Sequence, residues 1–310
     1  MSSAIRTTGL RRVFGDVVAV DSLDLDIAKG EIFGLVGPDG AGKTTTMRML
    51  TGIMTPSAGS AQVADLDVAH DAERLKDHIG YMSQRFGLYP DLTVLENLDF
   101  YAEIYGVPAR GRAEKTERLL GFSNLTPFKQ RLAGNLSGGM KQKLGLACAL
   151  IHTPSVLFLD EPTNGVDPVS RRDFWRILYQ LVREGVTIFV STAYLDEAER
   201  CNRLALLHQG RLLGVGTPDE IKAMMPGALL EVRTSAPRRT AALLREKLTD
   251  ASVGLFGDRV HLVTRDAVLA EARARELISA AGFEIVSIRL IEPSLEDVFV
   301  SVVAAQPSLP

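Results

Sequence analysis

Short apolar runs and longer helical patterns alternate between residues 31 and 207. The apolar runs predict buried strands, because both faces of such a strand must be covered. They lie at residues 31–36, 79–83, 156–160, 187–192 and 204–207. Apolar residues at helical spacing predict helices at 45–50, 92–106, 112–120, 137–151, 169–183 and 195–201. Strands that alternate with helices in this way indicate an α/β fold.

The two ends of the chain carry different patterns. Residues 4–33 show strand-like alternation, with predicted strands at 17–20 and 23–27. Turn residues near 217–227 mark a boundary, and beyond it the order strand, helix, strand, strand, helix, strand is typical of a ferredoxin-like α+β domain. Its predicted elements lie at 228–233, 238–248, 252–264 with a turn at 257–258, 267–280 and 283–290. We therefore predict a domain over 1–220, with a helical subdomain at about 85–153, and a second domain over 227–304.

Composition and charge narrow the class of protein. The 310 residues suit two domains, and a hydrophobic fraction of 46% is enough for a sizeable core. A net charge of −3 gives no basic excess, so we expect no nucleic acid partner. Cys148 and Cys201 form neither a metal-binding spacing nor a disulfide framework, which is typical of a reducing cytoplasm.

No segment has the pattern of a signal peptide or a membrane span. Residues 1–12 lack the apolar core that a signal peptide needs. No run approaches the roughly 18 apolar residues of a transmembrane helix. If the chain acts at a membrane, we expect it to do so through a partner.

The segment from Gly37 to Thr44 fits the pattern G-x-x-x-x-G-K-[ST] without a gap. A predicted strand precedes it and a predicted helix follows it, so backbone N–H groups and the positive end of the helix point at one anion. Lys43 can reach the β- and γ-phosphates of a nucleoside triphosphate, and the Thr44 hydroxyl can bind Mg²⁺. Phe14 either stacks on an adenine ring or is a core aromatic. The predicted nucleotide-binding residues are Phe14, Gly37, Pro38, Asp39, Gly40, Ala41, Gly42, Lys43, Thr44 and Thr45.

Two adjacent carboxylates, Asp160 and Glu161, end the predicted buried strand at 156–160. Ligands of open α/β sheets bind at the carboxyl ends of the strands. Asp160 is placed to hold the Mg²⁺, directly or through water, and Glu161 to polarise a water that attacks the γ-phosphate. Further along, Ser137 is a good N-cap, and the two glycines after it let the helix start approach another chain or a ligand closely.

These motifs together resemble those of the ATP-binding-cassette (ABC) ATPases. The resemblance covers about residues 5–220, and its most specific element is the signature Leu-Ser-Gly-Gly. The motifs follow the order of the family: the phosphate loop 37–44, Gln84 of the Q-loop, the signature 136–139, Asp160 with Glu161, and the D-loop 166–168. The resemblance implies a P-loop NTPase fold with a mixed sheet and a helical subdomain, and ATP and Mg²⁺ as cofactors.

The resemblance also implies a role for each matching residue. Phe14 would stack on the adenine, and Gln84 would contact Mg²⁺ and the attacking water and sense a membrane partner. Thr44, Gln84 and Asp160 would bind the metal, and Glu161, Lys43 and Gln84 would act in catalysis.

A second cassette is also implied. The signature residues Ser137, Gly138 and Gly139 would bind ATP held by another subunit, and Asp167 belongs to the D-loop. A helix N-terminus with glycines is a suitable anion site for this purpose. Because one chain carries one cassette, we expect a homodimer or a heterodimer.

Two further segments resemble the ATPase subunits of ABC-2 type exporters, which include drug-efflux systems. They are Leu-Asp-Glu-Ala-Glu at 195–199 and Pro-Ser-Leu-Glu-Asp-Val-Phe at 293–299. This resemblance implies an integral membrane ABC-2 type permease as partner and a place on the cytoplasmic side of the cell membrane. The permease would dock near Gln84, and the candidate contacts, which are equally well explained as subdomain core, are Phe86, Leu88, Tyr89 and Leu92.

The sequence departs from the family pattern at two positions. Asp39 stands where the family usually has Asn, which places an extra carboxylate near polyphosphate. Ala193 stands where the family places a histidine after the strand at 187–192. Alanine cannot donate a hydrogen bond to the γ-phosphate, so we expect weakened hydrolysis, or a partner cassette that supplies the competent site.

Three functions compete at this point. The first is the ATPase subunit of an ABC-2 type exporter, whose cargo the sequence does not indicate. The second is a nucleotide-gated regulatory module with little turnover, which Ala193 favours. The third is a soluble ABC protein of translation or DNA repair, although the chain has neither tandem cassettes nor a basic patch.

Overall fold

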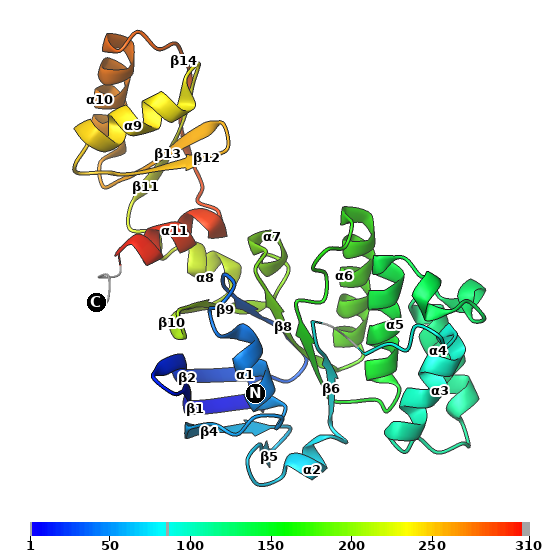
Figure 1. Cartoon of the computed structure of the whole chain (residues 1–310). Coiled ribbons are helices and arrows are strands. Elements are labelled where there is room, and N and C mark those ends of the chain that lie inside the picture. Colours follow the sequence, from blue (N-terminus) through cyan, green and yellow to red (C-terminus); the bar gives the residue numbers. More distant parts are fainter. Residues whose placement is uncertain (1, 85–86, 306–310) are drawn as a thin grey trace. The chain divides into compact units, whose positions relative to one another are not determined.

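The computed structural model describes residues 2–84 and 87–305. The chain divides into two compact units, Met1–Thr217 and Pro218–Pro310 (Figure 1). Phe86, one of the candidate permease contacts, and the first two residues of the predicted helical subdomain lie outside the described residues.

The elements of the first unit follow the predicted alternation. Its strands are β1 (Ser3–Phe14), β2 (Val17–Ala28), β3 (Ile32–Val36), β4 (Ala58–Val63), β5 (Leu66–Asp67), β6 (Ile79–Met82), β7 (Val156–Asp160), β8 (Thr187–Thr192), β9 (Arg203–His208) and β10 (Arg211–Gly216). Its α-helices are α1 (Lys43–Leu50), α2 (Ala72–Leu75), α3 (Val94–Ile104), α4 (Arg112–Phe122), α5 (Gly138–Leu150), α6 (Pro168–Arg183) and α7 (Leu195–Ala198). Two short 3₁₀ turns, η1 (Thr126–Phe128) and η2 (Ala133–Asn135), connect α4 to α5.

A six-stranded sheet forms the centre of this unit, in the order β10-β9-β3-β8-β7-β6. Its strands pair in parallel except at the edge, where β10 runs antiparallel to β9. The predicted buried strands are therefore confirmed as neighbours in one mixed sheet. Every residue of β3, β7 and β8 is buried, which explains why their sequences are apolar without alternation.

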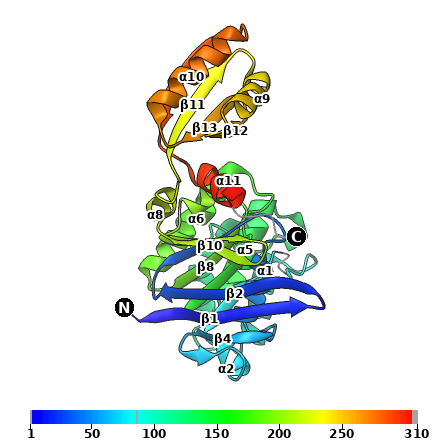
Figure 2. The ribbon, with the colours of Figure 1, turned by 90° about the vertical axis from the view of Figure 1, so that its left-hand side faces the viewer.

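A separate four-stranded antiparallel sheet has the order β2-β1-β4-β5, and Figure 2 shows β1, β2 and β4 side by side. The prediction of two strands at 17–20 and 23–27 was wrong, because β2 runs through both without a break. The turn-like residues between them lie inside the strand, with Ser22 at φ 51°. The pairing with β1 shifts register around Leu10, so a bulge absorbs these residues instead of a turn.

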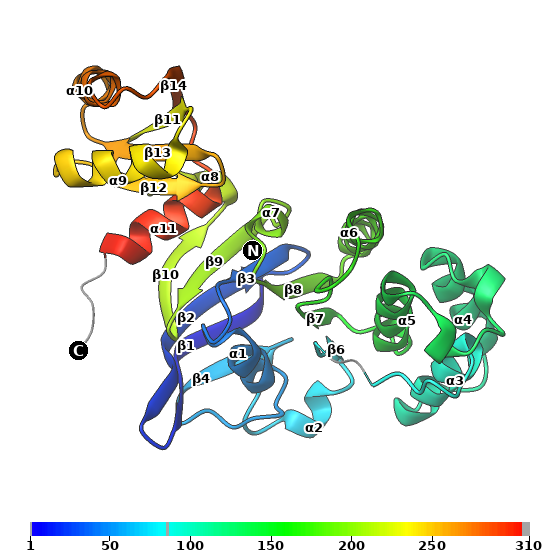
Figure 3. The same cartoon turned by 45° about the horizontal axis from the view of Figure 1, so that its top comes forward.

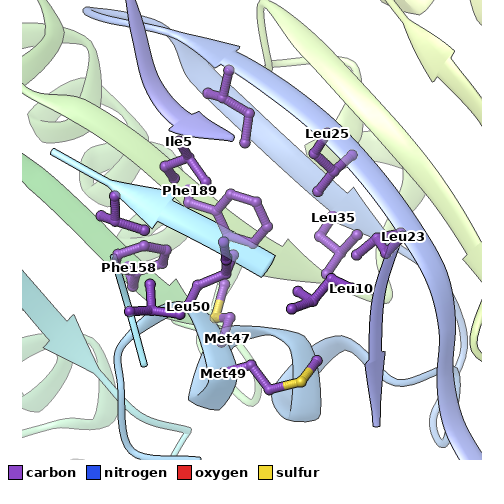
Figure 4. Packing of buried hydrophobic residues seen from close by; sticks show 14 of the residues in the cluster. Ile5, Leu10, Leu23, Leu25, Leu35, Met47, Met49, Leu50, Phe158 and Phe189 are labelled. Carbon is purple, nitrogen blue, oxygen red and sulfur yellow. The ribbon is translucent and has the colours of Figure 1, made fainter. Parts of the chain in front are cut away.

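One apolar cluster fills the space between the two sheets and includes α1. It contains Leu10, Leu23, Leu35, Met47 and Phe189, all fully buried (Figure 4). Burying a side chain of this size stabilises the fold by about 2 kcal/mol each. Because residues of both sheets and of α1 pack in this cluster, it fixes the position of the start of α1 relative to the sheets.

The predicted helical subdomain lies between β6 and β7 in the sequence. Figure 1 shows α3, α4 and α5 together on one side of β6, whereas α1 lies on the other side of that strand. Helix α3 begins at a capping box, in which Thr93 and Glu96 satisfy each other's backbone N–H groups. Helices α3, α4 and α5 bury a shared core of Leu98, Leu120 and Leu144.

The second unit contains the predicted βαββαβ order (Figure 3). Its elements are α8 (Pro218–Lys222), β11 (Ala228–Thr234), α9 (Pro237–Lys247), β12 (Ser252–Phe256), β13 (Arg259–Thr264), α10 (Ala267–Ala280), β14 (Ile285–Ile291) and α11 (Leu295–Ala305). The strands form one antiparallel sheet in the order β12-β13-β11-β14, as expected for a ferredoxin-like domain. Helices α9 and α10 pack on one face of it, where Leu230, Leu244 and Ala274 share a core.

Two helices of the second unit were not predicted. Helix α8 has five residues, too few for a helical period to show. Helix α11 contains the β-branched residues Val298, Val300, Val302 and Val303, which favour strands when judged locally.

Helix α11 is joined to the sheet by a buried polar contact. His261 Nδ1 of β13 lies 2.6 Å from Asp297 Oδ1, and both residues are buried. Asp297 Oδ2 accepts from the backbone N–H of Ser294 at 2.9 Å and from its hydroxyl at 2.6 Å. Burial alone would raise the pKa of Asp297, but the hydrogen bonds from His261 and Ser294 outweigh it and lower that pKa.

Within the described residues, the helices are all too short or too polar to cross a lipid bilayer.

The two cysteines are both free and buried, and burial raises the pKa of each thiol. Buried thiols with a raised pKa are poor nucleophiles, so both cysteines are unreactive in this environment.

We expect Asp297→Asn to loosen the contact between α11 and β13. An amide oxygen is a weaker acceptor than a carboxylate, and the loss of a hydrogen bond to a charged group costs about 2 kcal/mol. Hydrogen exchange of the full chain, measured by mass spectrometry, should become faster in peptides that cover 259–264 and 295–305, and stay unchanged in α6.

The matched control is Glu296→Gln, since Glu296 is the exposed neighbour of Asp297. Because the folded pKa of Asp297 is lowered, its stabilisation is complete above the pKa of about 4 of an unfolded aspartate and is lost as the pH falls further. The difference in protection between wild type and Asp297→Asn should therefore vanish in acid. Equal exchange in the two proteins at neutral pH would contradict the prediction.

Candidate functional site

The phosphate loop, Asp160 and Glu161 meet where the parallel strands of the central sheet end. The register places Val36 of β3 beside Thr192 of β8, and Asp160 of β7 beside Ser191. Parallel strands have their carboxyl ends at the same edge, so the segments after β3, β7 and β8 are neighbours although they are far apart in the sequence.

The loop after β3 approaches the neighbouring backbone so closely that glycine is required. A Cβ on Gly37 would lie 2.1 Å from the carbonyl oxygen of Leu207, and one on Gly42 would lie 2.5 Å from that of Ala19. Gly42 also has φ 106°, a conformation that other residues rarely adopt. The loop is therefore held tightly between β2 and β9, with α1 starting directly after it.

Lys43 turns back over this loop. Its Nζ donates to the carbonyl oxygens of Gly37 at 2.8 Å and Pro38 at 3.1 Å. The same Nζ lies 3.0 Å from Glu161 Oε1, and only 4% of the Lys43 side chain is exposed. A buried ammonium needs such partners, because desolvation without them is costly.

Glu161 has an unusual backbone and several partners. Its φ is +48°, which is rare for a residue with a side chain. Its N–H donates to Ser191 Oγ at 3.0 Å, and its Oε2 accepts from Gln84 Nε2 at 3.0 Å and from Asn164 Nδ2 at 3.3 Å. The carboxylate is thus held at the sheet edge, beside Lys43.

Asp160 offers a ligand atom that the protein itself leaves unsatisfied. It is 1% exposed, and its Oδ1 accepts from Ser191 Oγ at 2.6 Å. Its Oδ2 is buried and has no hydrogen-bond partner among the described residues. An orphaned buried carboxylate oxygen is expected where a metal ion or a metal-bound water completes the site.

A complete metal cage is not built from the protein alone. Within the described part of the chain, no group of three or more His, Cys, Asp or Glu side chains is arranged to hold a metal ion. Mg²⁺ is usually bound by one or two carboxylates together with substrate phosphates and waters. The donor set of Asp160, Thr44 and Gln84 fits this mode of binding.

Phe14 is not a core residue. It ends β1, its side chain is 43% exposed, and the guanidinium of Arg12 lies 4.6 Å from its ring centre. The alternative of a core aromatic is therefore wrong, and stacking on adenine stays a prediction.

Asp39 is also exposed, at the tip of the phosphate loop.

The signature residues and the D-loop lie at the starts of two neighbouring helices. Ser137 is the N-cap of α5 and accepts from the N–H of Met140 at 3.3 Å. Asp167 caps α6 in the same way, and hydrogen bonds from Ser170 lower its pKa. Gly139 is needed for their packing, because a Cβ there would lie 2.5 Å from Ser170 Oγ. Gly138 is exposed, with open space around it.

Ala193 follows β8 directly and is exposed. The sequence did not reveal three further side chains that contact Asp160, Glu161 or one another at this site: Ser191, Asn164 and Tyr194. Ser191 could have been found from the expected pairing of the strands at 156–160 and 187–192, whereas the other contacts depend on loop geometry.

A groove of about 300 Å³ lies beside Gln84. It is lined by Gln84, Leu88, Pro90, Ala133, Gly134, Lys141 and Gln142. Of the candidate contacts, Leu88 packs against the subdomain core and Leu92 is half-buried, whereas Tyr89 is 44% exposed. The buried Asn97 fixes the backbone of Tyr89 with hydrogen bonds to its N–H and its carbonyl.

Comparison with known families covers both units. A model of the ABC transporter family matches residues 20–164. A second model, described as the C-terminal domain of DrrA1-3-like ATP-binding proteins, matches residues 216–303.

Curated relatives align along nearly the whole chain. It is 45% identical over 306 residues to an Escherichia coli protein described as the probable multidrug ABC transporter ATP-binding protein YbhF. That match covers 97% of this chain but 52% of the relative, so the chain spans about half the length of the E. coli protein. It is 35% identical to the daunorubicin resistance ATP-binding protein DrrA2 of Streptomyces coeruleorubidus, over 96% of this chain and 94% of that protein.

Solved structures match about seven tenths of the chain. The cbiO1 protein of Clostridium perfringens, part of the ABC transporter complex cbiONQ, has a TM-score of 0.67 and 26% identity. The match covers 72% of this chain and 92% of that protein. A nucleotide-free ATP-binding cassette from an ABC transporter has a TM-score of 0.65 at the same identity.

The fold and the residues gathered at the sheet edge define an ABC-type phosphate-loop ATPase, as the motifs predicted. The relatives allow a narrower statement. The chain belongs to the family of ATP-binding proteins of ABC transporters.

We expect Gly37→Ala to damage both the fold and nucleotide binding. The new Cβ would meet a backbone oxygen of β9, so the loop or the strand must move, at a cost of about 1–3 kcal/mol. A displaced loop no longer directs its N–H groups at a phosphate. The expected result is a lower melting temperature and loss of binding of a fluorescent ATP analogue.

Gly40→Ala is the matched control in the same loop. Gly40 has φ +79°, so alanine is strained there by roughly 1 kcal/mol, but its Cβ meets nothing within 4 Å. It should keep most of its nucleotide binding. Equal binding of the analogue by both variants would contradict the prediction, because the close approach of Gly37 to the carbonyl oxygen of Leu207 would then not set the conformation of the loop.

Proposed function

We propose that the chain is the ATP-binding and ATP-hydrolysing subunit of an ABC-2 type exporter, in which ATP-driven dimerisation powers efflux through a separate permease. The observation that carries this proposal is the convergence of Lys43, Asp160 and Glu161 at the carboxyl edge of the sheet. The described activities of the relatives support it: multidrug transport, daunorubicin resistance and, for a Bacillus licheniformis relative at 32% identity, bacitracin transport.

The binding step follows from the partners of Lys43. The triphosphate would occupy the phosphate loop, and its negative charge would take the place of Glu161 as the partner of the ammonium group. Thr44, Asp160 and Gln84 would hold Mg²⁺, which neutralises charge on the phosphates when bound. The unsatisfied Oδ2 of Asp160 supports this assignment.

The hydrolytic step follows from the release of Glu161. Once Lys43 engages phosphate, Glu161 Oε1 can accept a proton from a water that attacks the γ-phosphate. Gln84 and Asn164 hold the other oxygen, Oε2, and so keep the carboxylate in place. A fixed general base of this kind typically contributes on the order of 10²–10⁴ in rate.

Two partners complete the proposal. Ser137, Gly138 and Gly139 would close over ATP bound to a second cassette, because they form a helix start suited to an anion, at which Ser137 and Gly138 are exposed. An integral membrane permease would dock in the groove beside Gln84, with Tyr89 as the exposed contact. The chain would then act at the cytoplasmic side of the cell membrane.

The alternative of a regulatory module with little turnover receives no support from the comparisons. The relatives described above are transport and resistance proteins. The same descriptions favour a transporter over a soluble protein of translation or DNA repair.

The first test of this function uses the protein purified from membranes together with the permease it binds. The wild-type complex should hydrolyse ATP and export a drug from vesicles. Glu161→Gln should lower kcat at least about 100-fold and abolish export, yet still bind ATP, because Lys43 and the loop are intact. Failure to purify with any membrane protein would argue against the exporter.

The second test addresses Ala193. We propose that its missing imidazole slows hydrolysis, and loss of one positioned transition-state contact typically costs on the order of 10²–10³ in rate. Ala193 is exposed, so Ala193→His has room for the ring and should raise kcat. Ala193→Leu controls for side-chain size. Equal rates in wild type and Ala193→His would refute the idea.

A further inference from the structure

The carboxylate of Glu161 depends on a side-chain amide that must face the right way. Glu161 Oε2 accepts a hydrogen bond from Asn164 Nδ2 at 3.3 Å. An ionised carboxylate only accepts hydrogen bonds, whereas an amide has one donating end and one accepting end. If the amide of Asn164 turned over, its oxygen would face the carboxylate and repel it.

Tyr194 anchors the other end of this amide. Its hydroxyl donates to Asn164 Oδ1 at 3.3 Å. The carboxylate of Glu161 sets the orientation of the amide, because it can only accept, and the hydroxyl of Tyr194 then holds the amide in place through its oxygen. The three side chains therefore form a chain of hydrogen bonds from Tyr194 through Asn164 to Glu161.

Tyr194 is held at its ring and at its backbone. The guanidinium of Arg171 lies 4.5 Å from its centre, within the range of a cation–π contact. The backbone N–H of Tyr194 donates to Thr192 Oγ1 at 3.0 Å. With the ring held in this way, little freedom is lost when the hydroxyl engages Asn164.

A buried carboxylate, Glu197, holds these supports together. It is fully buried, accepts from Thr192 Oγ1 at 2.9 Å, and pairs with Arg171 Nε at 3.3 Å. It also accepts from the hydroxyl of Thr163, the residue before Asn164. Glu197 therefore ties the end of β8 to the segment that carries Asn164. Removing one of the partners of a buried charge is destabilising, so this arrangement is held firmly.

We propose that Tyr194 is a positioning residue for hydrolysis, which anchors Asn164 so that Asn164 can hold the carboxylate of Glu161. This inference rests on the function proposed above. Ala193 brings no polar side chain to the site, so Tyr194 is the polar residue through which the segment after β8 reaches Glu161. The Tyr194 side chain then acts through Asn164.

Tyr194→Phe tests the proposal, because it removes the hydroxyl and keeps the ring on Arg171. The complex with this variant should lose about three- to tenfold in kcat, the usual worth of one uncharged hydrogen bond, with an unchanged KM for ATP. Asn164→Ala should lose more, because its partner is charged. Adding Tyr194→Phe to Asn164→Ala should cause no further loss.

Tyr179→Phe is the matched control. Tyr179 is 39% exposed against 38% for Tyr194, and its hydroxyl also donates over 3.3 Å, to the carbonyl oxygen of Arg200. This variant should keep the wild-type kcat. If Tyr194→Phe also keeps it, or if its effect adds fully to that of Asn164→Ala, the proposal is overturned.

A second measurement does not require turnover. The side-chain amide of Asn164 can be observed by ¹⁵N NMR and assigned from the signal that Asn164→Ala lacks. Tyr194→Phe should shift this signal, and Tyr179→Phe should leave it in place. A signal unmoved by Tyr194→Phe overturns the inference, whereas a shifted signal in a protein without ATPase activity would count against the proposed function alone.

Discussion

The site depends on one buried ion pair between segments that are far apart in the sequence. Lys43 and Glu161 are separated by 3.0 Å, and their side chains are 4% and 10% exposed. A charge at this depth is tolerated only with close partners, so the loop supplies two carbonyl oxygens to the ammonium as well. The pair thereby joins the start of α1 to the end of β7. The two sheets must pack around α1 in a way that keeps Lys43 Nζ and Glu161 Oε1 3.0 Å apart.

The need to bring its carboxylate to Lys43 also accounts for the backbone conformation of Glu161. A left-handed conformation costs a residue with a side chain roughly 1–2 kcal/mol, and here it lets the carboxylate turn toward Lys43. Hydrogen bonds from its N–H to the carbonyl and the hydroxyl of Ser191 offset this strain. The Ser191 hydroxyl also donates to Asp160 Oδ1, so it links the carboxylate of Asp160 to the backbone N–H of Glu161.

The sequence predicted the elements whose signals are local. The buried strands were visible as apolar runs, and the phosphate loop as a fixed spacing around Lys43. Strand β2 was predicted as two strands because a bulge, unlike a turn, is decided by the partner strand. The contacts of Tyr194, Asn164 and Glu197 could not be predicted, since they arise from loops that meet only after β7 and β8 have paired. The apolar character of Phe14 likewise did not reveal that its ring is exposed.

The contact between His261 and Asp297 has a consequence for how the protein is made. The sheet of the second unit places β11 between β13 and β14, and α11 then joins β13 through that contact. The residues up to Asp297 must therefore have left the ribosome before this unit can close. The first unit has all its strands within residues 3–216 and can fold earlier, so during synthesis a finished cassette precedes an unfinished neighbour. A nascent chain whose synthesis stops between these two folding steps would therefore carry a folded first unit and an unfolded second unit.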